Sequence, residues 1–168
     1  MNDIRLRAPE PEDVDRLYQW ENDKDGGLHG HWARAPLSRF QIWEYINTYD
    51  ADPMTRGEVR MMIQRGDDIV GTVDLYDIDL YNRRASVGIY VDRQYRGRGI
   101  GDSAVEAIES YAVNKLGLHT LSAFSLIENA GGCCLFERRG YMHVGILKES
   151  IRVDKAYHDV AIYAKILV

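Results

Sequence analysis

A glycine-rich segment is the feature of this sequence that most limits what the chain can fold into. Residues 94–101 read QYRGRGIG, between an alternating apolar stretch at residues 85–91 and a helical pattern that ends before Gly117. Glycine tolerates positive φ and lets the backbone come close to a ligand. Backbone N–H groups at the start of a helix attract anions, and the helix dipole adds to this attraction. The segment therefore predicts a strand–loop–helix unit that holds an anionic group such as a diphosphate.

Two familiar phosphate-binding loops do not fit this segment. A P-loop requires Gly-Lys followed by Ser or Thr, which the chain lacks. A dinucleotide-binding loop requires Gly-x-Gly-x-x-Gly in a parallel β-α-β unit, with an acid about 20 residues later. Here the glycines stand at positions 97, 99 and 101, and Asp102 follows them. The preceding strand also belongs to a predicted antiparallel meander, so another kind of anion-binding loop is needed.

The segment resembles the coenzyme A loop of the GNAT acetyltransferases. That loop has the pattern Gln/Arg-x-x-Gly-x-Gly/Ala, which Gln94, Gly97 and Gly99 match. Residues 128–141, ENAGGCCLFERRGY, resemble the later motif of the same family, Asn-x-x-Ala-x-x-Leu-Tyr-x-x-x-Gly-Phe. The matching residues of this second motif are Asn129, Leu135, Gly140 and Tyr141, with Gly132 at the small position. On both motifs together the chain is identified as a member of the GNAT superfamily.

Weaker matches at both ends of the chain favour one branch of that superfamily. Trp20-Glu21-Asn22 and Tyr157-His158-Asp159-Val160 are similar to segments of the spermidine and ribosomal-protein N-acetyltransferases, as are residues 6–10 and 82–85. The resemblance extends across nearly the whole chain. It implies an enzyme of this branch and leaves the acceptor open.

Hydrophobic periodicity predicts a mixed α/β fold. Strands are predicted at residues 4–7, 59–63, 69–80, 85–91, 119–126, 141–147 and 156–166. Helices are predicted at residues 12–21, 100–116 and 129–139, with one more that Ser38 caps and that carries residues 40–46. This order implies one domain over residues 1–168, with helices on both faces of a mixed sheet. The resemblance implies a mostly antiparallel sheet of six to seven strands with a central splay.

The resemblance also implies where acetyl-coenzyme A binds. In this family the cosubstrate lies in a V between two splayed strands, here residues 86–91 and 121–126. The backbone at Tyr90 and Val91 would hold the pantetheine arm and the thioester carbonyl, and Asn129 would hydrogen-bond to the arm. Backbone N–H groups of one continuous run would hold the diphosphate, namely those of Arg96, Gly97, Arg98, Gly99, Ile100 and Gly101.

The implied reaction is direct attack of a neutral amine on the thioester. Free alkylamines have a pKa of about 10, so a base must remove a proton before or during attack. Relatives often carry a glutamate where this chain has Ser86. Asp74, Asp77 and Asp79 on the neighbouring strand are the replacement candidates, either as the base or as ligands of a second ammonium group on a polyamine.

The proton donor of the family is also missing. Many relatives carry a tyrosine at the position of Phe136, and its hydroxyl is assigned as the acid that protonates the leaving thiolate. Because a thiol has a pKa of about 8.5, its thiolate leaves fairly well without a proton donor. Cys134, Tyr141 or water are the candidates for a replacement, and the sequence does not choose among them.

The charge distribution bears on the acceptor. The net charge is −5, and the 11 basic and 17 acidic residues before Ala85 give that half −6, against +1 for the rest. An acidic half suits a cationic partner, although an acidic surface needs none. A polyamine such as spermidine is one expected acceptor. A protein or peptide N-terminus, or another small amine, is the alternative, and a coenzyme A-binding module with little catalysis is a third possibility.

Other partners and locations are excluded or expected on simpler grounds. No basic stripe suggests nucleic-acid binding, and no apolar run reaches the roughly 20 residues that span a bilayer. Cys133 and Cys134 are adjacent and have no companions at metal-ligand spacing, so no metal is expected. The N-terminus lacks the apolar core of a signal peptide, which favours the cytoplasm. Family members often form dimers or larger rings, so a homo-oligomer is expected. His29 and His31 fall in a predicted loop, either beside the acceptor or on the surface.

Overall fold

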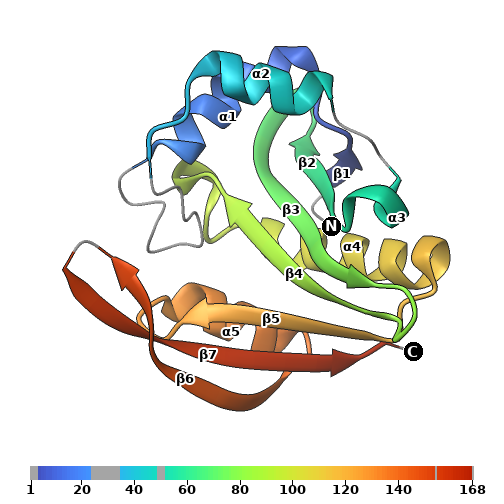
Figure 1. Cartoon of the computed structure of the whole chain (residues 1–168), viewed down its shortest axis with the longest axis vertical. Helices are drawn as coiled ribbons and strands as arrows, with labels where there is room; N and C mark the ends of the chain where they lie inside the picture. Colours follow the sequence, from blue (N-terminus) through green and yellow to red (C-terminus); the bar gives the residue numbers. More distant parts are fainter. Residues whose placement is uncertain (1–3, 24–34, 49–51, 154, 168) are drawn as a thin grey trace.

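One sheet runs through the part of the chain that the computed structural model describes, residues 4–23, 35–48, 52–153 and 155–167. Its order is β1-β2-β3-β4-β5-β7-β6 (Figure 1). The strands are β1 (Ile4–Arg7), β2 (Val59–Arg65), β3 (Asp68–Asp79), β4 (Arg84–Val91), β5 (Thr120–Leu126), β6 (Met142–Val153) and β7 (Ala156–Ile166). The helices are α1 (Val14–Glu21), α2 (Arg39–Asn47), α3 (Pro53–Arg56), α4 (Ile100–Leu116) and α5 (Ala130–Arg138), with single 3-10 turns at Pro11–Asp13 and Arg93–Tyr95.

The sheet opens at its centre. Neighbouring strands are antiparallel except β4 and β5, which run parallel. The β4–β5 ladder joins Arg84 to Thr120 at one end and stops at Val87 and Ala123. Beyond that point the two strands diverge, as Figure 1 shows. The predicted mostly antiparallel sheet with a central splay is therefore confirmed.

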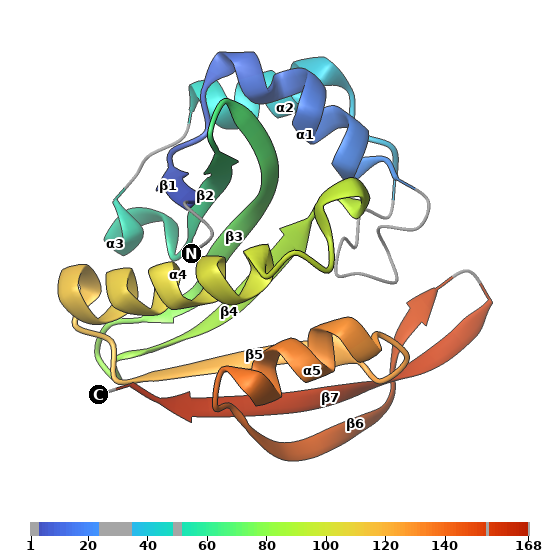
Figure 2. The same cartoon turned by 180° about the vertical axis from the view of Figure 1, so that it is seen from behind.

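Helices cover both faces of the sheet, as the sequence predicted. Successive side chains of a strand point to opposite faces, and the neighbours Met62 and Ile63 of β2 are both fully buried in different clusters. Ile63 lies in the larger core with α4 and α5, which stand before the sheet in Figure 2. Met62 lies in a smaller core with Leu17 of α1 and Ile42 of α2.

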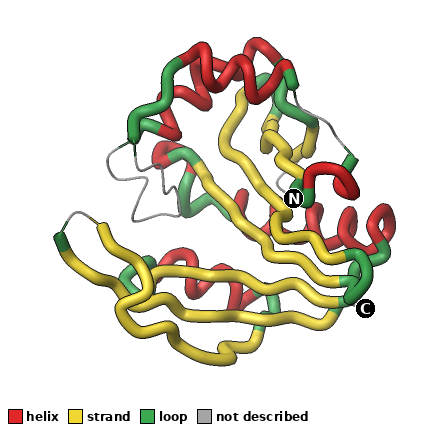
Figure 3. Tube along the Cα trace, in the orientation of Figure 1, coloured by secondary structure: helices red, strands yellow, loops and turns green. Residues whose placement is uncertain are grey.

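Local signals explain most of the element boundaries. The Ser38 side chain accepts a hydrogen bond from Gln41 N, and Gln41 reciprocates, so Ser38 caps α2 as predicted. Gly117, with a φ of 63°, ends α4 as predicted. The short α3 was not predicted. β6 runs to Val153, past the predicted end at Leu147, as the long hairpin in Figure 3 shows.

A bulge hides the second half of β6 from a periodicity argument. The pairing of β6 with β7 shifts register between Leu147 and Ile151, and Glu149 has a φ of 48°. Asp159 of β7 holds the bulge, because its carboxylate accepts hydrogen bonds from Glu149 N (2.8 Å) and Lys148 Nζ (2.7 Å). A bulge breaks the two-residue alternation on which the prediction depends.

Candidate active site

The open side of β4 offers peptide groups to a ligand. Tyr90 O faces Gly71 of β3, and Asp92 N donates to Val70 O (2.8 Å). Peptide groups of neighbouring strand residues point in opposite directions. Those of Ile89 and Val91 therefore point into the opening, where β5 has already moved away. A ligand with a carbonyl or amide group can lie between the two strands and form hydrogen bonds with these peptide groups, as a neighbouring strand would.

The glycine-rich loop joins β4 to α4 and exposes further N–H groups. Gly97 and Gly99 have φ values of 72° and 74°, which other residues rarely adopt. The first hydrogen bond of α4 runs from Ser103 N to Gly99 O (3.2 Å). The N–H groups of Ile100, Gly101 and Asp102 therefore have no partner inside the helix. This is the anion-binding arrangement that the sequence predicts.

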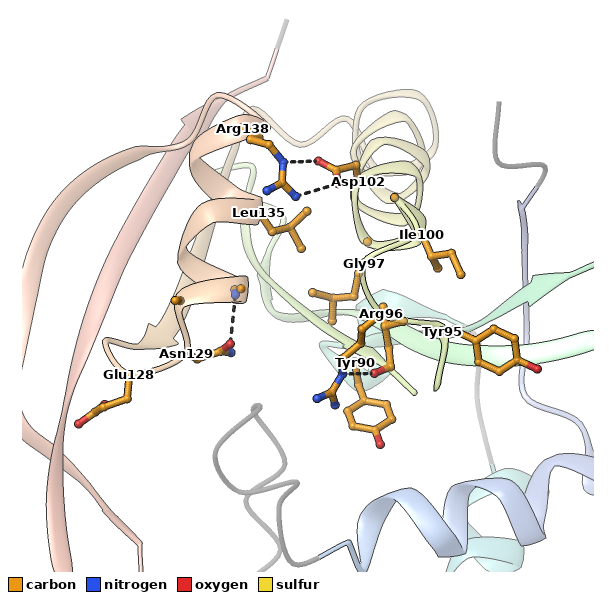
Figure 4. Close-up of a pocket in the computed structure, with 17 residues that line it drawn as sticks. Tyr90, Tyr95, Arg96, Gly97, Ile100, Asp102, Glu128, Asn129, Leu135 and Arg138 are labelled. Atoms are coloured by element: carbon orange, nitrogen blue, oxygen red, sulfur yellow. Dashed lines mark hydrogen bonds and ion pairs between the residues drawn. The ribbon is translucent and has the colours of Figure 1, made fainter. Parts of the chain in front are cut away.

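A cavity of about 710 Å³ lies between this loop and α5 (Figure 4). We call it the glycine-loop cavity. It is lined by the end of β4, the loop, and the first turns of α4 and α5, including all but one of the residues predicted to bind the cosubstrate: Tyr90, Val91, Arg96, Gly97, Gly99, Ile100, Gly101 and Asn129. The exception is Arg98, whose guanidinium lies 5.7 Å from the centre of the Tyr95 ring.

Two polar side chains shape this cavity. Arg96 Nε donates to Val91 O (2.8 Å), and the guanidinium stands 5.6 Å from the centre of the Tyr90 ring. Asn129 caps α5, since its Oδ1 accepts from Gly132 N (3.1 Å). Figure 4 shows both contacts. Within the described residues Asn129 Nδ2 donates no hydrogen bond, so it can serve a ligand. The free N–H groups, the glycines and this amide fit a diphosphate with an amide-containing arm.

A second cavity, of about 570 Å³, extends from the same opening and shares four lining residues with the first: Ile89, Tyr90, Asn129 and Gly132. Its wall on β2 and β3 is polar and includes Glu58, Arg60, Thr72, Asp74, Tyr76 and Asp77. Its other wall, on β5, α5, β6 and β7, is mostly apolar and includes Phe124, Leu126, Phe136, Leu147, Ile151 and Val160. We call it the acidic cavity. A group in one cavity can reach a group in the other through the opening between β4 and β5.

Two of the three candidate aspartates, Asp74 and Asp77, line the acidic cavity in different surroundings, whereas Asp79 lines neither cavity. Asp74 receives two hydrogen bonds from Arg60, from Nε (3.0 Å) and from NH2 (3.1 Å), and Arg60 also contacts Glu21 (3.0 Å). Burial acts to lower the pKa of Arg60, but Asp74 and its other neighbours raise it above the ordinary value, so the guanidinium stays charged. Asp74 is therefore neutralised by a permanent cation.

Asp77 is exposed at the edge of the cavity and makes no ion pair within the described part of the chain. Its φ of 50° lies at an irregularity of the β3–β4 pairing, between Tyr76 and Asp79. Such a bulge redirects side chains. Neither the irregularity nor the capture of Asp74 by Arg60 was predicted.

Tyr76 is a polar residue of this wall that the sequence argument missed. Its ring packs over Gly88, and its pKa is raised by burial and by the charge of Asp77, while a hydrogen bond with Ser86 acts in the opposite direction. Alternation along β3 puts Tyr76 on the same face as Asp74, and that signal was available in the sequence. The buried Ser86 lies directly opposite Tyr76 on β4.

The candidates for a proton donor lie in three different places. Phe136 lines the acidic cavity, so the position usually held by tyrosine is at the opening. Cys134 is on the exposed side of α5 and lines neither cavity. Tyr141 is buried in the core and also lines neither; burial, followed by the charge of Glu109, raises its pKa. The structure thus brings neither Cys134 nor Tyr141 to the opening. His29 and His31 lie outside the described residues.

Three consecutive residues fasten α1 beside the opening. Trp20 Nε1 donates to Asp92 Oδ2 (2.9 Å), and the Trp20 ring contacts the Tyr90 ring at 5.4 Å between centroids. Glu21 pairs with Arg60, as described above. Asn22 bonds through both side-chain atoms to Leu37, with Nδ2 to Leu37 O at 2.9 Å and Leu37 N to Oδ1 at 2.8 Å. These contacts give a structural role to the Trp20-Glu21-Asn22 match noted in the sequence.

Among the described residues, no group of three or more His, Cys, Asp or Glu side chains could hold a metal ion. No helix in the described ranges is long and apolar enough to cross a membrane.

Comparison with known proteins identifies the family. Residues 3–142 match the family model of the acetyltransferase (GNAT) domain, so the chain belongs to the GNAT acetyltransferases. It is an N-acetyltransferase that uses acetyl-coenzyme A. The spermidine N(1)-acetyltransferase of Vibrio cholerae is 25% identical over 158 residues, which cover 94% of this chain and 89% of that protein. The superfamily, enzyme class and cosubstrate predicted from the sequence are thereby confirmed.

Solved structures show the same fold at low identity. The spermidine N-acetyltransferase from Vibrio cholerae in complex with CoA and spermine superposes with a TM-score of 0.86 at 22% identity, covering 99% of this chain and 97% of that one. RimL, a ribosomal L7/L12 alpha-N-protein acetyltransferase in complex with coenzyme A, also gives 0.86, at 19% identity, covering 98% and 94%. Both acceptor classes expected from the sequence therefore occur on this fold.

Proposed function

We propose that this enzyme transfers the acetyl group of acetyl-coenzyme A to a primary amine of an aliphatic polyamine such as spermidine. The observation that carries the proposal is Asp77, a carboxylate at the edge of the acidic cavity that makes no ion pair with any described residue. A polyamine has a second cationic amine at a distance from the reacting one, and a carboxylate of this cavity that no described residue pairs can bind it. Relatives named as spermidine N-acetyltransferases support the same acceptor class.

The charge of the surrounding wall supports a cationic acceptor. Around the acidic cavity four carboxylates, those of Glu21, Glu58, Asp74 and Asp77, stand against two guanidiniums, those of Arg56 and Arg60. The two arginines are engaged by Glu58, Asp74 and Glu21, at distances of 2.8 to 3.0 Å. The group thus carries a net charge of −2, and Asp77, which pairs with no described residue, lines the cavity. A low-dielectric wall concentrates this potential on a cation.

The cosubstrate is assigned to the glycine-loop cavity. Bound acetyl-coenzyme A supplies an acetyl thioester whose thiolate is the leaving group. We infer that the N–H groups of the loop and of the first turn of α4 hold its diphosphate, and that Asn129 Nδ2 donates to its pantetheine arm. The peptide groups of Ile89 and Val91 hold the thioester carbonyl at the opening and donate to the oxygen as it becomes negative.

The reaction also requires two proton movements. The attacking amine must lose its proton, and we assign its acceptance to water in the open cavity, since Arg60 occupies Asp74 and Asp77 binds the second amine. Phe136 has no proton to give at the opening. Because a thiol with a pKa of about 8.5 ionises readily, its thiolate can leave without a proton donor. Solvent then protonates the thiolate.

A peptide α-amine is the second candidate acceptor, and the apolar wall of the acidic cavity favours it. Phe124 and Leu147 are 41% and 43% exposed, although both are large hydrophobic residues. Side chains near a peptide N-terminus would cover them, whereas a polyamine offers only methylene groups. The relative named as a ribosomal-protein-serine acetyltransferase belongs to this class.

Release of coenzyme A thiol from acetyl-coenzyme A tests the proposal. We expect turnover of spermidine, spermine or putrescine at millimolar concentration, with a higher kcat/KM than for peptides that carry a free N-terminus. Asp77→Asn should raise the polyamine KM about five- to tenfold, as expected when one partly exposed charge pair is lost. The KM for acetyl-coenzyme A should stay the same.

Asp79→Asn is the matched control. Asp79 bonds to Asn82 and Arg84 at the turn after β3 and lines neither cavity. Its loss should leave the acceptor KM unchanged. If the enzyme acetylates peptides and shows no activity with any polyamine, the peptide α-amine becomes the acceptor and the polyamine proposal is refuted. If Asp77→Asn and wild type have equal KM values for polyamines, the role of Asp77 is refuted, but the acceptor class is not.

A further inference from the structure

An ion pair joins the two helices that border the glycine-loop cavity. Asp102 lies in the first turn of α4, and Arg138 is the last residue of α5. Arg138 Nε contacts Asp102 Oδ1 at 3.2 Å, and NH2 contacts Oδ2 at 2.9 Å. Both side chains line the cavity, and Figure 4 shows them facing one another at its rim. The two-point contact fixes the orientation of both groups.

The position of Asp102 creates an electrostatic conflict. An acid in the first turn stabilises a helix, because it complements the positive end of the dipole. The same first turn offers its free N–H groups to the glycine-loop cavity, where an anionic ligand needs that positive end. An uncompensated carboxylate at Asp102 would repel a diphosphate and compete for the same N–H groups. The pairing with Arg138 removes the conflict, because the rim then carries no net charge.

The adjacent arginine, Arg139, takes a different position. Arg139 turns to the middle of α4, where it contacts Glu109 (3.0 Å) and Glu106 (3.7 Å). It lines neither cavity. Of these two neighbours, only Arg138 reaches the rim. The pKa of Arg138 is raised by its hydrogen bond to Asp102 and by the charge of that carboxylate.

We propose that Arg138 is a positioning residue for acetyl-coenzyme A, which neutralises Asp102 at the start of α4 so that the diphosphate meets a rim without net negative charge. The inference rests on acetyl-coenzyme A as the cosubstrate and is independent of the acceptor. It assigns Arg138 an effect on cofactor affinity that acts through Asp102, and it predicts that the two residues are strongly coupled.

A double-mutant cycle on coenzyme A binding tests this coupling. The Kd of coenzyme A is measured by calorimetry for wild type, Arg138→Gln, Asp102→Asn and the double variant. We expect Arg138→Gln to weaken binding about tenfold, the size expected when one unit charge acts on a doubly charged group near the surface. Asp102→Asn should bind as well as wild type or more tightly. The double variant should return to within about twofold of wild type, because the repelling carboxylate is gone.

Salt dependence and two further variants complete the test. The ratio of the Kd of Arg138→Gln to that of wild type should shrink as salt is raised to 1 M, where the screening length falls to about 3 Å. Arg138→Lys keeps the charge and should bind nearly as well as wild type. Lys115→Gln removes an exposed cation from the last turn of the same helix, far from the cavity, and should change nothing.

Two results would overturn the inference. If the double variant binds as weakly as Arg138→Gln, Arg138 contacts the ligand itself or only braces the helices. If Arg138→Gln binds like wild type, the rim charge is irrelevant. Thermal unfolding of each variant separates these results from misfolding, and Arg138→Lys keeps the test available should Arg138→Gln fail to fold.

Discussion

Gly132→Ala separates the cofactor role of Asn129 from its role as a helix cap. Gly132 lies in the first turn of α5, where its N–H bonds to Asn129 Oδ1. A Cβ built there would come 2.7 Å from Asn129 Nδ2 and 2.8 Å from Ser125 Oγ, both too short for real contacts. Since the backbone of α5 is fixed by the helix, the Asn129 amide has to move. Gly131→Ala is the matched control, because its Cβ would lie an ordinary 3.7 Å from Asn129 Oδ1.

The two substitutions should change the free energy of unfolding in opposite directions. Alanine gains about 1 kcal/mol over glycine inside a helix. In Gly131→Ala nothing opposes that gain, so the variant should be more stable than wild type. In Gly132→Ala the gain is offset by about 1 kcal/mol for the weakened cap and by about 1–2 kcal/mol for the crowded contacts. The two variants should therefore differ by about 2–3 kcal/mol in unfolding free energy, or about 4–12 °C in Tm for a chain of this size.

Coenzyme A affinity provides the second measurement. If Asn129 Nδ2 donates to the pantetheine arm, its displacement removes one hydrogen bond, which is about 0.5–1.5 kcal/mol or a two- to twelvefold rise in Kd. Both glycines line the glycine-loop cavity, so Gly131→Ala controls for a methyl group added to its wall while the Asn129 amide stays in place. Calorimetric titration should show a higher Kd for Gly132→Ala than for Gly131→Ala. A Gly132→Ala protein that is as stable as Gly131→Ala and binds coenzyme A equally well would refute the reasoning about Asn129.

Two further outcomes follow from the β6–β7 hairpin. The hydrogen bond from Lys148, together with the Glu149 backbone N–H, lowers the pKa of Asp159. Its stabilising contribution is therefore complete above the pKa of the unfolded state, about 3.9, and is lost as the pH falls through the lower pKa of the folded state. Asp159→Asn should flatten the dependence of Tm on pH below pH 4. An unaltered Tm profile would contradict this. The predicted homo-oligomer would use the exposed edge strand β6, where Ile146 is 42% exposed. Ile146→Asp should then shift the mass in light scattering to that of a monomer, whereas a wild type that is already monomeric would refute it.

Features that depend on neighbouring residues were within reach of the sequence. The glycine loop, the Ser38 cap and the start of α5 each follow from a few adjacent residues, so their geometry is encoded locally. The opening between β4 and β5 was available only through the family resemblance. Periodicity gives the two strands but does not tell where their pairing stops.

Features that depend on register or on helix phase were out of reach. Asp74 and Asp77 looked equivalent on the predicted strand, yet Arg60 holds the first and a bulge redirects the second. The sequence does not show that pairing because it depends on the β2–β3 register. Cys134 shares α5 with Gly132, and only the phase of the helix turns the cysteine outward and the glycine inward.

The charge asymmetry of the chain acquires a spatial meaning in the fold. The residues before Ala85, with a net charge of −6, supply β2, β3 and the carboxylates of the acidic cavity. The residues after it supply the glycine loop, α4 and α5, and in the glycine-loop cavity Arg96 and Arg138 offset Asp102 and Glu128, so that a ligand reaches the N–H groups of the loop without meeting a net negative charge. β4 lies between the two groups and contributes Ile89 and Tyr90 to both cavities. The strand that opens the sheet thus also separates the side suited to a cationic amine from the side suited to an anionic cosubstrate. In the proposed arrangement, an acceptor in the acidic cavity and a thioester in the glycine-loop cavity meet at that opening, and the negative charge on the acceptor's side favours a cationic amine there.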